Sequence, residues 1–172
     1  MYHPVAIITN LRSYLAYRFN AMRTRAQRDQ FLARLTGRNT SLQTFPNTLE
    51  GKNPNRRMLP IQEIPVGKIV GTLNRRDDFD YKFRPLGKMT RDRWVNTHLT
   101  LDQEGWEPIL VHKLGGEYFV EDGHHRLSVA HELGLKYIQA RVWEYSVVET
   151  IKVNHPCCNP TCADSSRLYI AG

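Results

Sequence analysis

The sequence predicts an α+β fold, in which a compact domain with a mixed β-sheet and packed helices follows a basic N-terminal helix. Three observations support this class: an Arg-rich stretch with apolar residues at helical spacing, short apolar runs separated by turn residues beyond residue 58, and further helical patterns among those runs. At 172 residues the chain suits one domain with an appendage. We expect a basic helical extension and linker (1–58), the α+β domain (59–145) and a C-terminal tail (146–172).

The N-terminal helix is predicted over residues 11–35, with Thr9 or Asn10 as its N-cap. One face carries an apolar stripe at helical spacing, made of Leu11, Leu15, Phe19, Met22 and Ala26. Arginines occupy the other faces. Residues 36–57 are rich in Gly, Asn, Thr and Pro without a clear period, so we expect a loop or linker there.

The first half of the domain is predicted to contain strands, a long loop and a helix. The run LPIQEIPVGKIVG from residue 59 predicts one or two strands. Residues 74–90 are polar enough for a long loop, in which Phe79 and Phe83 are available as apolar anchors. A helix is then expected to begin near Thr90 and to end before Gly105.

The second half of the domain is predicted as a hairpin, a helix and a strand. The runs EPILVHK and EYFVED flank a Gly-Gly pair that supplies the positive backbone angles of a tight antiparallel turn. Apolar residues at helical spacing predict a helix over residues 125–133, which Gly134 is placed to end. The run KYIQARVWEY alternates, so its apolar residues Ile138, Ala140 and Val142 share one face of a strand.

Basic residues are concentrated at the N-terminus. Residues 1–58 contain ten Arg or Lys and two acidic residues, whereas residues 59–172 contain fourteen and fifteen. A net charge of +8 against −1 is typical of an arm that binds nucleic acid or another anionic surface. An Arg-rich, acid-poor N-terminus is also typical of an organellar transit peptide, and a solvated helix face that binds nothing is the remaining interpretation.

No apolar run is long enough to cross a bilayer, so we expect no transmembrane segment. The three cysteines, Cys157, Cys158 and Cys162, lie together near the C-terminus and leave the body without a disulfide framework. We therefore expect a cytoplasmic protein, or an organellar one where the N-terminus directs import. His155 and these cysteines match no standard zinc spacing, and a mobile tail is the interpretation that we favour over a zinc site.

The stretch VEDGHHRLSVAHELG contains the strongest candidate site, because a glycine, two histidines and an arginine stand where a strand turns into a helix. A sharp turn at Gly123 leaves the backbone N–H groups of the first helical turn open to an anion. His124, His125 and Arg126 surround that position, and a guanidinium suits two phosphate oxygens. Asp122 is expected to cap the helix or to hold one histidine. A purely structural cap with surface histidines is the alternative.

A metal site is not expected in this histidine cluster. Adjacent residues at a helix start diverge by roughly 100°, so His124 and His125 cannot easily share one ion. His131 faces the same way as His124, but it lies about 10 Å along the axis, too far for a common tetrahedral site.

The order of these elements resembles the ParB N-terminal domain and sulfiredoxin superfamily over roughly residues 59–145. In that superfamily a Gly-x-x-Arg element follows a strand and opens a helix, and a later strand carries an Ile-x-Ala-x-Val pattern. The matching segments here are Gly123–Arg126 and Ile138–Val142. Sulfiredoxins resemble this element as Gly-Cys-His-Arg with a nucleophilic cysteine, and this chain has His124 at that position.

The resemblance implies a ParB/sulfiredoxin-like fold and a bound nucleotide, such as ATP, ADP or CTP, with magnesium. The phosphates would be held by Gly123, His124, His125 and Arg126 at the helix start. Arg75 or Arg76 would close over them from the long loop, so that positive charge and backbone amides stabilise the phosphoryl group.

Two functions of different classes remain open. The first is a nucleotide-dependent phosphoryl transferase or hydrolase (NTPase or nuclease-like), in which His124 or a carboxylate handles the proton. The candidate carboxylates are Asp77, Asp78 and Glu63. The second is a DNA-associated ParB-like protein, of a partition or nuclease-like kind, that uses the basic N-terminal helix. The histidine cluster favours the first function and the charge distribution favours the second.

Overall fold

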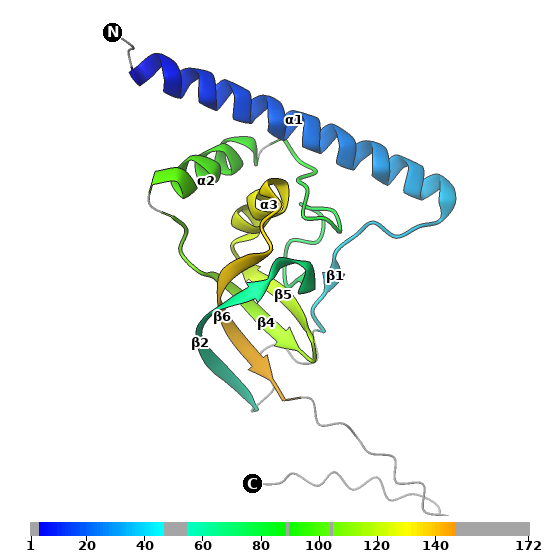
Figure 1. Cartoon of the computed structure of the whole chain (residues 1–172). Helices are drawn as coiled ribbons and strands as arrows, with labels where there is room; N and C mark the ends of the chain where they lie inside the picture. Colours follow the sequence, from blue (N-terminus) through cyan, green and yellow to red (C-terminus); the bar gives the residue numbers. More distant parts are fainter. Residues whose placement is uncertain (1–3, 47–54, 89, 104, 147–172) are drawn as a thin grey trace, which may run out of the picture.

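A computed structural model describes residues 4–46, 55–88, 90–103 and 105–146 (Figure 1). The Cys-rich tail, for which a zinc site and a mobile segment were the two interpretations, lies outside the described residues. The elements are, in chain order, α1 (Pro4–Thr36), β1 (Gln43–Thr44), β2 (Arg56–Pro65), the 3₁₀ helix η1 (Val66–Lys68), β3 (Ile69–Thr72), α2 (Arg91–Gln103), β4 (Ile109–Leu114), β5 (Glu117–Asp122), α3 (His124–Leu133) and β6 (Tyr137–Tyr145).

The strands form one mixed sheet in the order β1-β3-β5-β4-β6-β2. Strands β1, β3 and β5 are parallel, β4 is antiparallel to β5 and parallel to β6, and β2 is antiparallel to β6. The β4–β5 turn contains Gly115 with a φ of 61°, as the Gly-Gly pair predicts. The predicted face of β6 is confirmed, because its apolar residues are buried while Gln139 and Arg141 are exposed. The α+β class is therefore confirmed.

Two hydrophobic clusters hold the layers together. The larger one joins the sheet to α3 and to the loop after β3, with Ile109, Val120 and Leu127 fully buried. The second joins all three described helices: Phe19 of α1 and Val129 of α3 pack with Trp94 of α2. In Figure 1, α2 and α3 accordingly lie between the sheet and the long α1.

The N-terminal helix is longer than predicted. It begins at Pro4, so Thr9 and Asn10 lie inside the helix and not at its cap. Proline is tolerated there because the first N–H groups of a helix have no intrahelical partner. In the predicted stripe Leu11 alone is exposed, which shows that the stripe packs on the domain. Neither α1 nor any other helix in the described ranges is long and apolar enough to span a membrane.

The stretch predicted as a linker contributes to the sheet. Strand β1 pairs with β3, and Leu42 and Phe45 beside it are each 1% exposed. Strand β2 begins at Arg56, before the predicted division at residue 58. Strand β1 could not be predicted from the sequence because a strand of two residues shows no periodic pattern. The division of the chain at residue 58 stays a prediction.

The polar loop between β3 and α2 is held in place by two anchors. Phe79 and Phe83 are fully buried, as predicted. Asp80 is also buried, at 1% exposed, and accepts a hydrogen bond from Nε of Arg84 at 2.8 Å. The Nη2 atom of Arg84 lies 2.9 Å from the carboxylate of Asp29 on α1. This ion-pair network, which the sequence did not reveal, ties the loop to α1.

Candidate functional site

The predicted turn from strand to helix is present at Gly123. The residue adopts a left-handed conformation with a φ of 100°, between the end of β5 and the start of α3. A Cβ atom there would lie 2.4 Å from Cγ2 of Ile109, so glycine is required for space as well as for conformation. No side chain caps α3, which leaves the N–H groups of its first turn available to an anion.

A cavity of about 290 Å³ lies at this helix start. It is found at the carboxyl ends of the parallel strands β3 and β5, the edge at which open α/β sheets bind ligands. Its lining is polar and consists of Asn74, Arg75, Arg93, Thr97, Glu121, Asp122, Gly123, His124, His125 and Arg126. The predicted Gly123–Arg126 segment and Arg75 are therefore brought together. The cavity is called the phosphate cavity below, after the phosphate site that the sequence predicts here.

His124 is 4% exposed, and its Nε2 lies 2.7 Å from the hydroxyl of Thr72 at the end of β3. That hydroxyl accepts the backbone N–H groups of Asn74 (3.3 Å) and Arg75 (3.2 Å), which occupy its two lone pairs. The hydroxyl also donates to the carbonyl of Val120 at 3.3 Å. His124 is thus held at the end of β3 through Thr72. Burial, with a smaller effect of Arg75, lowers the pKa of His124 to about 4.

His125 is 8% exposed, and neither of its ring nitrogens has a hydrogen-bond partner in the described part of the chain. The ring packs edge-on against Phe79, with ring centroids 5.5 Å apart. Burial, with a smaller effect of Arg75, lowers the pKa of His125 to about 4, so the imidazole is neutral. An unpaired buried polar group costs about 1–3 kcal/mol. A ligand in the phosphate cavity would supply the partner that His125 lacks, and neither histidine lies on the surface as the structural-cap alternative required.

We expect these two histidines to weaken folding below neutral pH. Their pKa values in the folded chain, about 4, lie below the ordinary value of 6.5, so the unfolded chain takes up protons first as the pH falls. The stabilisation is complete above about pH 6.5 and is lost as the pH falls toward 4, by up to about 3 kcal/mol per histidine. Urea unfolding at about pH 7 and about pH 4.5 measures the loss. His124→Gln should lose less stability than the wild-type chain between these values, and equal losses would contradict the burial of a neutral His124.

Arg126 and Asp122 have other partners than those predicted. The Nη1 atom of Arg126 donates to the backbone carbonyls of Glu107 (2.6 Å) and Pro108 (3.2 Å), ahead of β4. Its Nη2 donates to the carboxylate of Asp122 at 2.5 Å. Asp122 therefore neither caps α3 nor holds a histidine, which corrects the prediction. Arg126 lines the phosphate cavity, but its terminal nitrogens fasten α3 to the segment before β4.

Two other arginines bring charge to the phosphate cavity. The side chain of Arg93 of α2, which the sequence did not single out, forms no ion pair or hydrogen bond within the residues described. Arg75 has one weak contact, with its Nη1 3.8 Å from the carboxylate of Asp78. Both charges act at the site, because each lowers the pKa of His125. Arg76, the alternative to Arg75, does not line the cavity.

The carboxylates predicted as bases do not reach the phosphate cavity. Asp77 and Asp78 are exposed residues of the loop, and neither lines the cavity. Glu63 lies on β2 and lines a different cavity, beside Trp106. No spacing in the sequence supported a catalytic role for these three carboxylates. The loop brings Arg75 to the cavity, whereas its two aspartates lie outside it.

Glu121 is the carboxylate that sequence reasoning missed. The residue lines the phosphate cavity, and the Oε2 atom of its side chain lies 2.7 Å from Nε2 of His112. His112 is 3% exposed, and its Nδ1 lies 2.8 Å from the hydroxyl of Tyr145. One carboxylate oxygen is thus fixed by a buried histidine. The signal in the sequence was the acidic residue that follows the apolar run Tyr118–Val120, two positions before Gly123.

Across the described ranges, no group of three or more His, Cys, Asp and Glu side chains is arranged to hold a metal ion. A magnesium ion that enters with a nucleotide would therefore take its ligands mainly from phosphate oxygens and water, with one or two carboxylates. Glu121 and Asp122 are the carboxylates that line the phosphate cavity.

With this fold and site, the chain is an α+β protein built on a six-stranded mixed sheet. No family model matches the sequence. No curated protein matches it either. Among solved structures, the crystal structure of sulfiredoxin from Arabidopsis thaliana is similar, with 26% sequence identity and a TM-score of 0.38, over 49% of this chain and 84% of that chain. A likeness at this TM-score carries no argument about the site, whose residues are assigned from their own geometry.

Proposed function

We propose that the chain is a nucleotide-binding protein with a ParB-like fold, in which the phosphates of the nucleotide lie at the start of α3. The observation that carries this proposal is the state of His125, a buried neutral imidazole beside an uncapped helix start, whose ring nitrogens have no hydrogen-bond partner among the described residues. Arg75 and Arg93 add positive charge with little competition from protein carboxylates. A cavity of about 290 Å³ suits a chain of phosphates, and the base would lie outside it.

In this proposal the protonation state of each group in the cavity decides its role in binding. The N–H groups of the first turn of α3 and the single ring N–H of neutral His125 donate to phosphate oxygens. Arg75 and Arg93 face the charge from the loop and from α2. Arg126 holds α3 in place through its hydrogen bonds to Asp122 and to the carbonyl of Glu107. It therefore positions the N–H donors of α3 but does not itself contact the phosphates.

For a phosphoryl transferase or a hydrolase, Glu121 is the proposed base in place of the loop aspartates. It lines the phosphate cavity, and His112 holds one of its oxygens, which leaves the other to accept a proton from a hydroxyl or a water. The proposed nucleotide is ATP, ADP or CTP with magnesium.

Calorimetry with magnesium and each of ATP, ADP and CTP tests the proposal. Arg75→Ala should weaken the binding of the tightest nucleotide by about tenfold to hundredfold, because a charge-assisted hydrogen bond is worth about 1.5–3 kcal/mol. Arg76→Ala is the matched control, since it removes the same charge from the adjacent, exposed position outside the cavity. Equal effects of the two substitutions, or binding of none of the three nucleotides, would contradict the site.

Association with DNA through α1 is a second candidate function. The observation in its favour is that Arg12, Arg25 and Arg34 of α1 form no ion pair within the described residues. The acidic residue of α1, Asp29, is already paired with Arg84. Free positive charge along one helix is the footprint of a protein that contacts phosphates of nucleic acid.

A further inference from the structure

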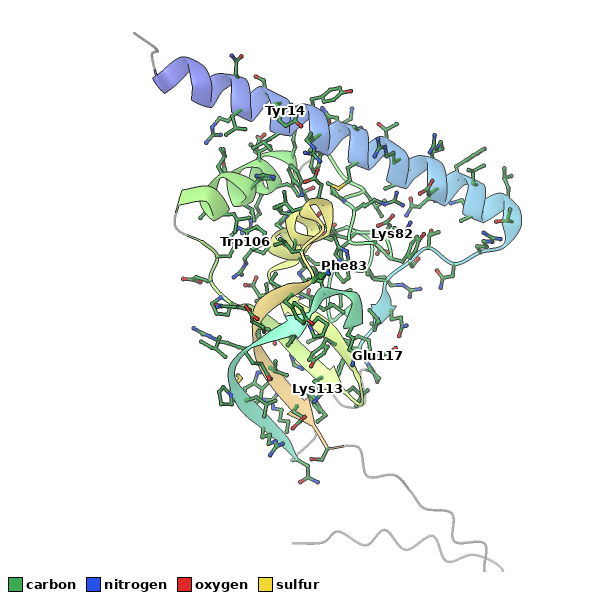
Figure 2. All side chains as sticks on the ribbon, viewed as in Figure 1. Tyr14, Lys82, Phe83, Trp106, Lys113 and Glu117 are labelled. Atoms are coloured by element: carbon green, nitrogen blue, oxygen red, sulfur yellow. The ribbon has the colours of Figure 1, made fainter. Side chains whose placement is uncertain are left out.

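A groove of about 500 Å³ lies between α1, the loop after β3 and the last turn of α3. We call it the α1 groove. The residues that matter for its chemistry are Tyr14, Tyr17, Arg18 and Arg25 of α1, Lys82 of the loop and His131 of α3. Figure 2 shows Tyr14 on α1 and Lys82 on the loop below the helix. The groove is distinct from the phosphate cavity, which lies at the opposite end of α3.

The α1 groove carries positive charge that the protein does not neutralise. Of its four cations, Arg18 is paired with Glu132, and Arg84 is paired with two aspartates. Arg25 is exposed and forms no ion pair within the described part of the chain. The ammonium of Lys82 contacts no carboxylate in the same residues, and it lies 5.2 Å from the centroid of the Tyr81 ring. Two cations therefore remain for an anionic ligand.

Aromatic rings line the same groove and are open to solvent. Tyr14 is 53% exposed and Tyr17 is 70% exposed, so both rings are accessible to a ligand in the groove. The guanidinium of Arg18 lies 5.7 Å from the ring of Tyr14, so planar cationic and aromatic groups are already in contact here. His131 stacks on Phe83, and its Nε2 has no hydrogen-bond partner among the residues described.

Free cations interleaved with exposed rings are the chemistry of sites that bind single strands. The cations contact phosphates, and the rings stack on bases, each stack being worth about 1–3 kcal/mol. A duplex offers phosphates but covers the faces of its bases, so the tyrosines would gain nothing from it. A groove of about 500 Å³ lies within the size range of pockets that bind one small ligand.

We propose that the α1 groove binds single-stranded nucleic acid, with phosphates on Arg25 and Lys82 and an unstacked base on Tyr17 or Tyr14. This inference rests on the second candidate function and deepens it, because it names the form of nucleic acid and the residues that select it. It is independent of nucleotide binding in the phosphate cavity.

Fluorescence anisotropy with labelled oligo(dT) and oligo(rU) of about eight nucleotides, and with a duplex of equal length, tests this inference on the full chain. Both single strands should bind more tightly than the duplex. Tyr17→Ala should weaken single-strand binding about fivefold to hundredfold, whereas Tyr17→Phe should retain it, because stacking needs the ring and not the hydroxyl. Arg25→Ala should reduce the slope of log Kd against log salt by about one.

Phe31→Ala is the matched control, since Phe31 is an exposed ring of α1 outside the groove, and it should leave affinity unchanged. The inference is overturned where the duplex binds as tightly as the single strands, or where Tyr17→Phe or Phe31→Ala weakens binding as much as Tyr17→Ala. Absence of any nucleic-acid binding overturns the second candidate function as well. Arg75→Ala should leave oligonucleotide binding intact, so a failure of the phosphate cavity is separable from a failure of the groove.

Discussion

Gly123→Ala is expected to destabilise the chain by about 2–6 kcal/mol. A non-glycine residue at a φ of 100° stores backbone strain of about 1–3 kcal/mol. The added Cβ would lie 2.4 Å from Cγ2 and 2.8 Å from Cβ of Ile109. Ile109 is fully buried in the larger hydrophobic cluster and cannot move aside, so overpacking adds about 1–3 kcal/mol. The midpoint of urea unfolding measures the effect.

Gly134→Ala separates the two contributions. Gly134 ends the same helix with a φ of 70°, but an added Cβ there would meet nothing within 4 Å. Gly134→Ala should therefore lower the free energy of unfolding only through backbone strain, by about 1–2 kcal/mol. A Gly123→Ala variant that is no less stable than Gly134→Ala would contradict the close packing of the turn against β4.

Arg84→Met is expected to cost about 3–5 kcal/mol, because it leaves a buried carboxylate without its counter-charge. Asp80 is 1% exposed and receives the Nε hydrogen bond of Arg84 at 2.8 Å. Methionine replaces most of the aliphatic volume of the arginine side chain. The loss of stability is therefore due to the missing charge and not to a cavity. The loop should loosen from α1 at the same time, since Arg84 also contacts Asp29. Urea unfolding gives the stability.

Arg57→Met is the control for this change. Arg57 donates to Glu144 at 2.8 Å from an exposed position on β2, and such pairs contribute about 0–1 kcal/mol. Equal losses for the two substitutions would show that the carboxylate of Asp80 is not buried as described. The double substitution Arg84→Met with Asp80→Asn should recover part of the stability, because it removes the unpaired charge.

Local sequence patterns predicted those parts of the site that lie within one strand–turn–helix unit. Gly123, the start of α3 one residue later, and Gly134 at its end follow from residues that are neighbours in the chain. The alternation of β6 was equally visible, because the period of a half-buried strand is local. The Gly123–Arg126 segment was therefore predicted at the helix start, whereas for the long loop the prediction left Arg75 and Arg76 as alternatives.

The remaining partners depend on long-range contacts that no local pattern encodes. Glu121 meets His112 only because the hairpin register brings β4 beside β5. Arg126 turns to carbonyls 18 and 19 residues earlier in the chain, which a helix-start pattern does not reveal. Arg93 reaches the cavity because α2 packs against α3, and exposed loop residues such as Asp77 point elsewhere.

Docking of α1 was hidden for a related reason. Its arginines dominated the composition and suggested a free arm, whereas Leu15 and Phe19 bury its opposite face against α2 and α3. The docked helix forms one wall of the α1 groove, which exists only in the folded chain. The proposal of single-stranded nucleic acid therefore rests on this groove, whereas charge alone predicted only an anionic partner.

Nucleotide binding at the start of α3 is tested most directly by NMR of the ¹⁵N-labelled chain during titration with ATP and magnesium, and likewise with ADP and CTP. We predict that a bound nucleotide shifts the backbone amides of His124, His125 and Arg126 and the ring nitrogens of His125, which gain a hydrogen-bond partner. Shifts confined to other parts of the chain, with the ring of His125 unchanged at saturation, would contradict a phosphate site at this helix start.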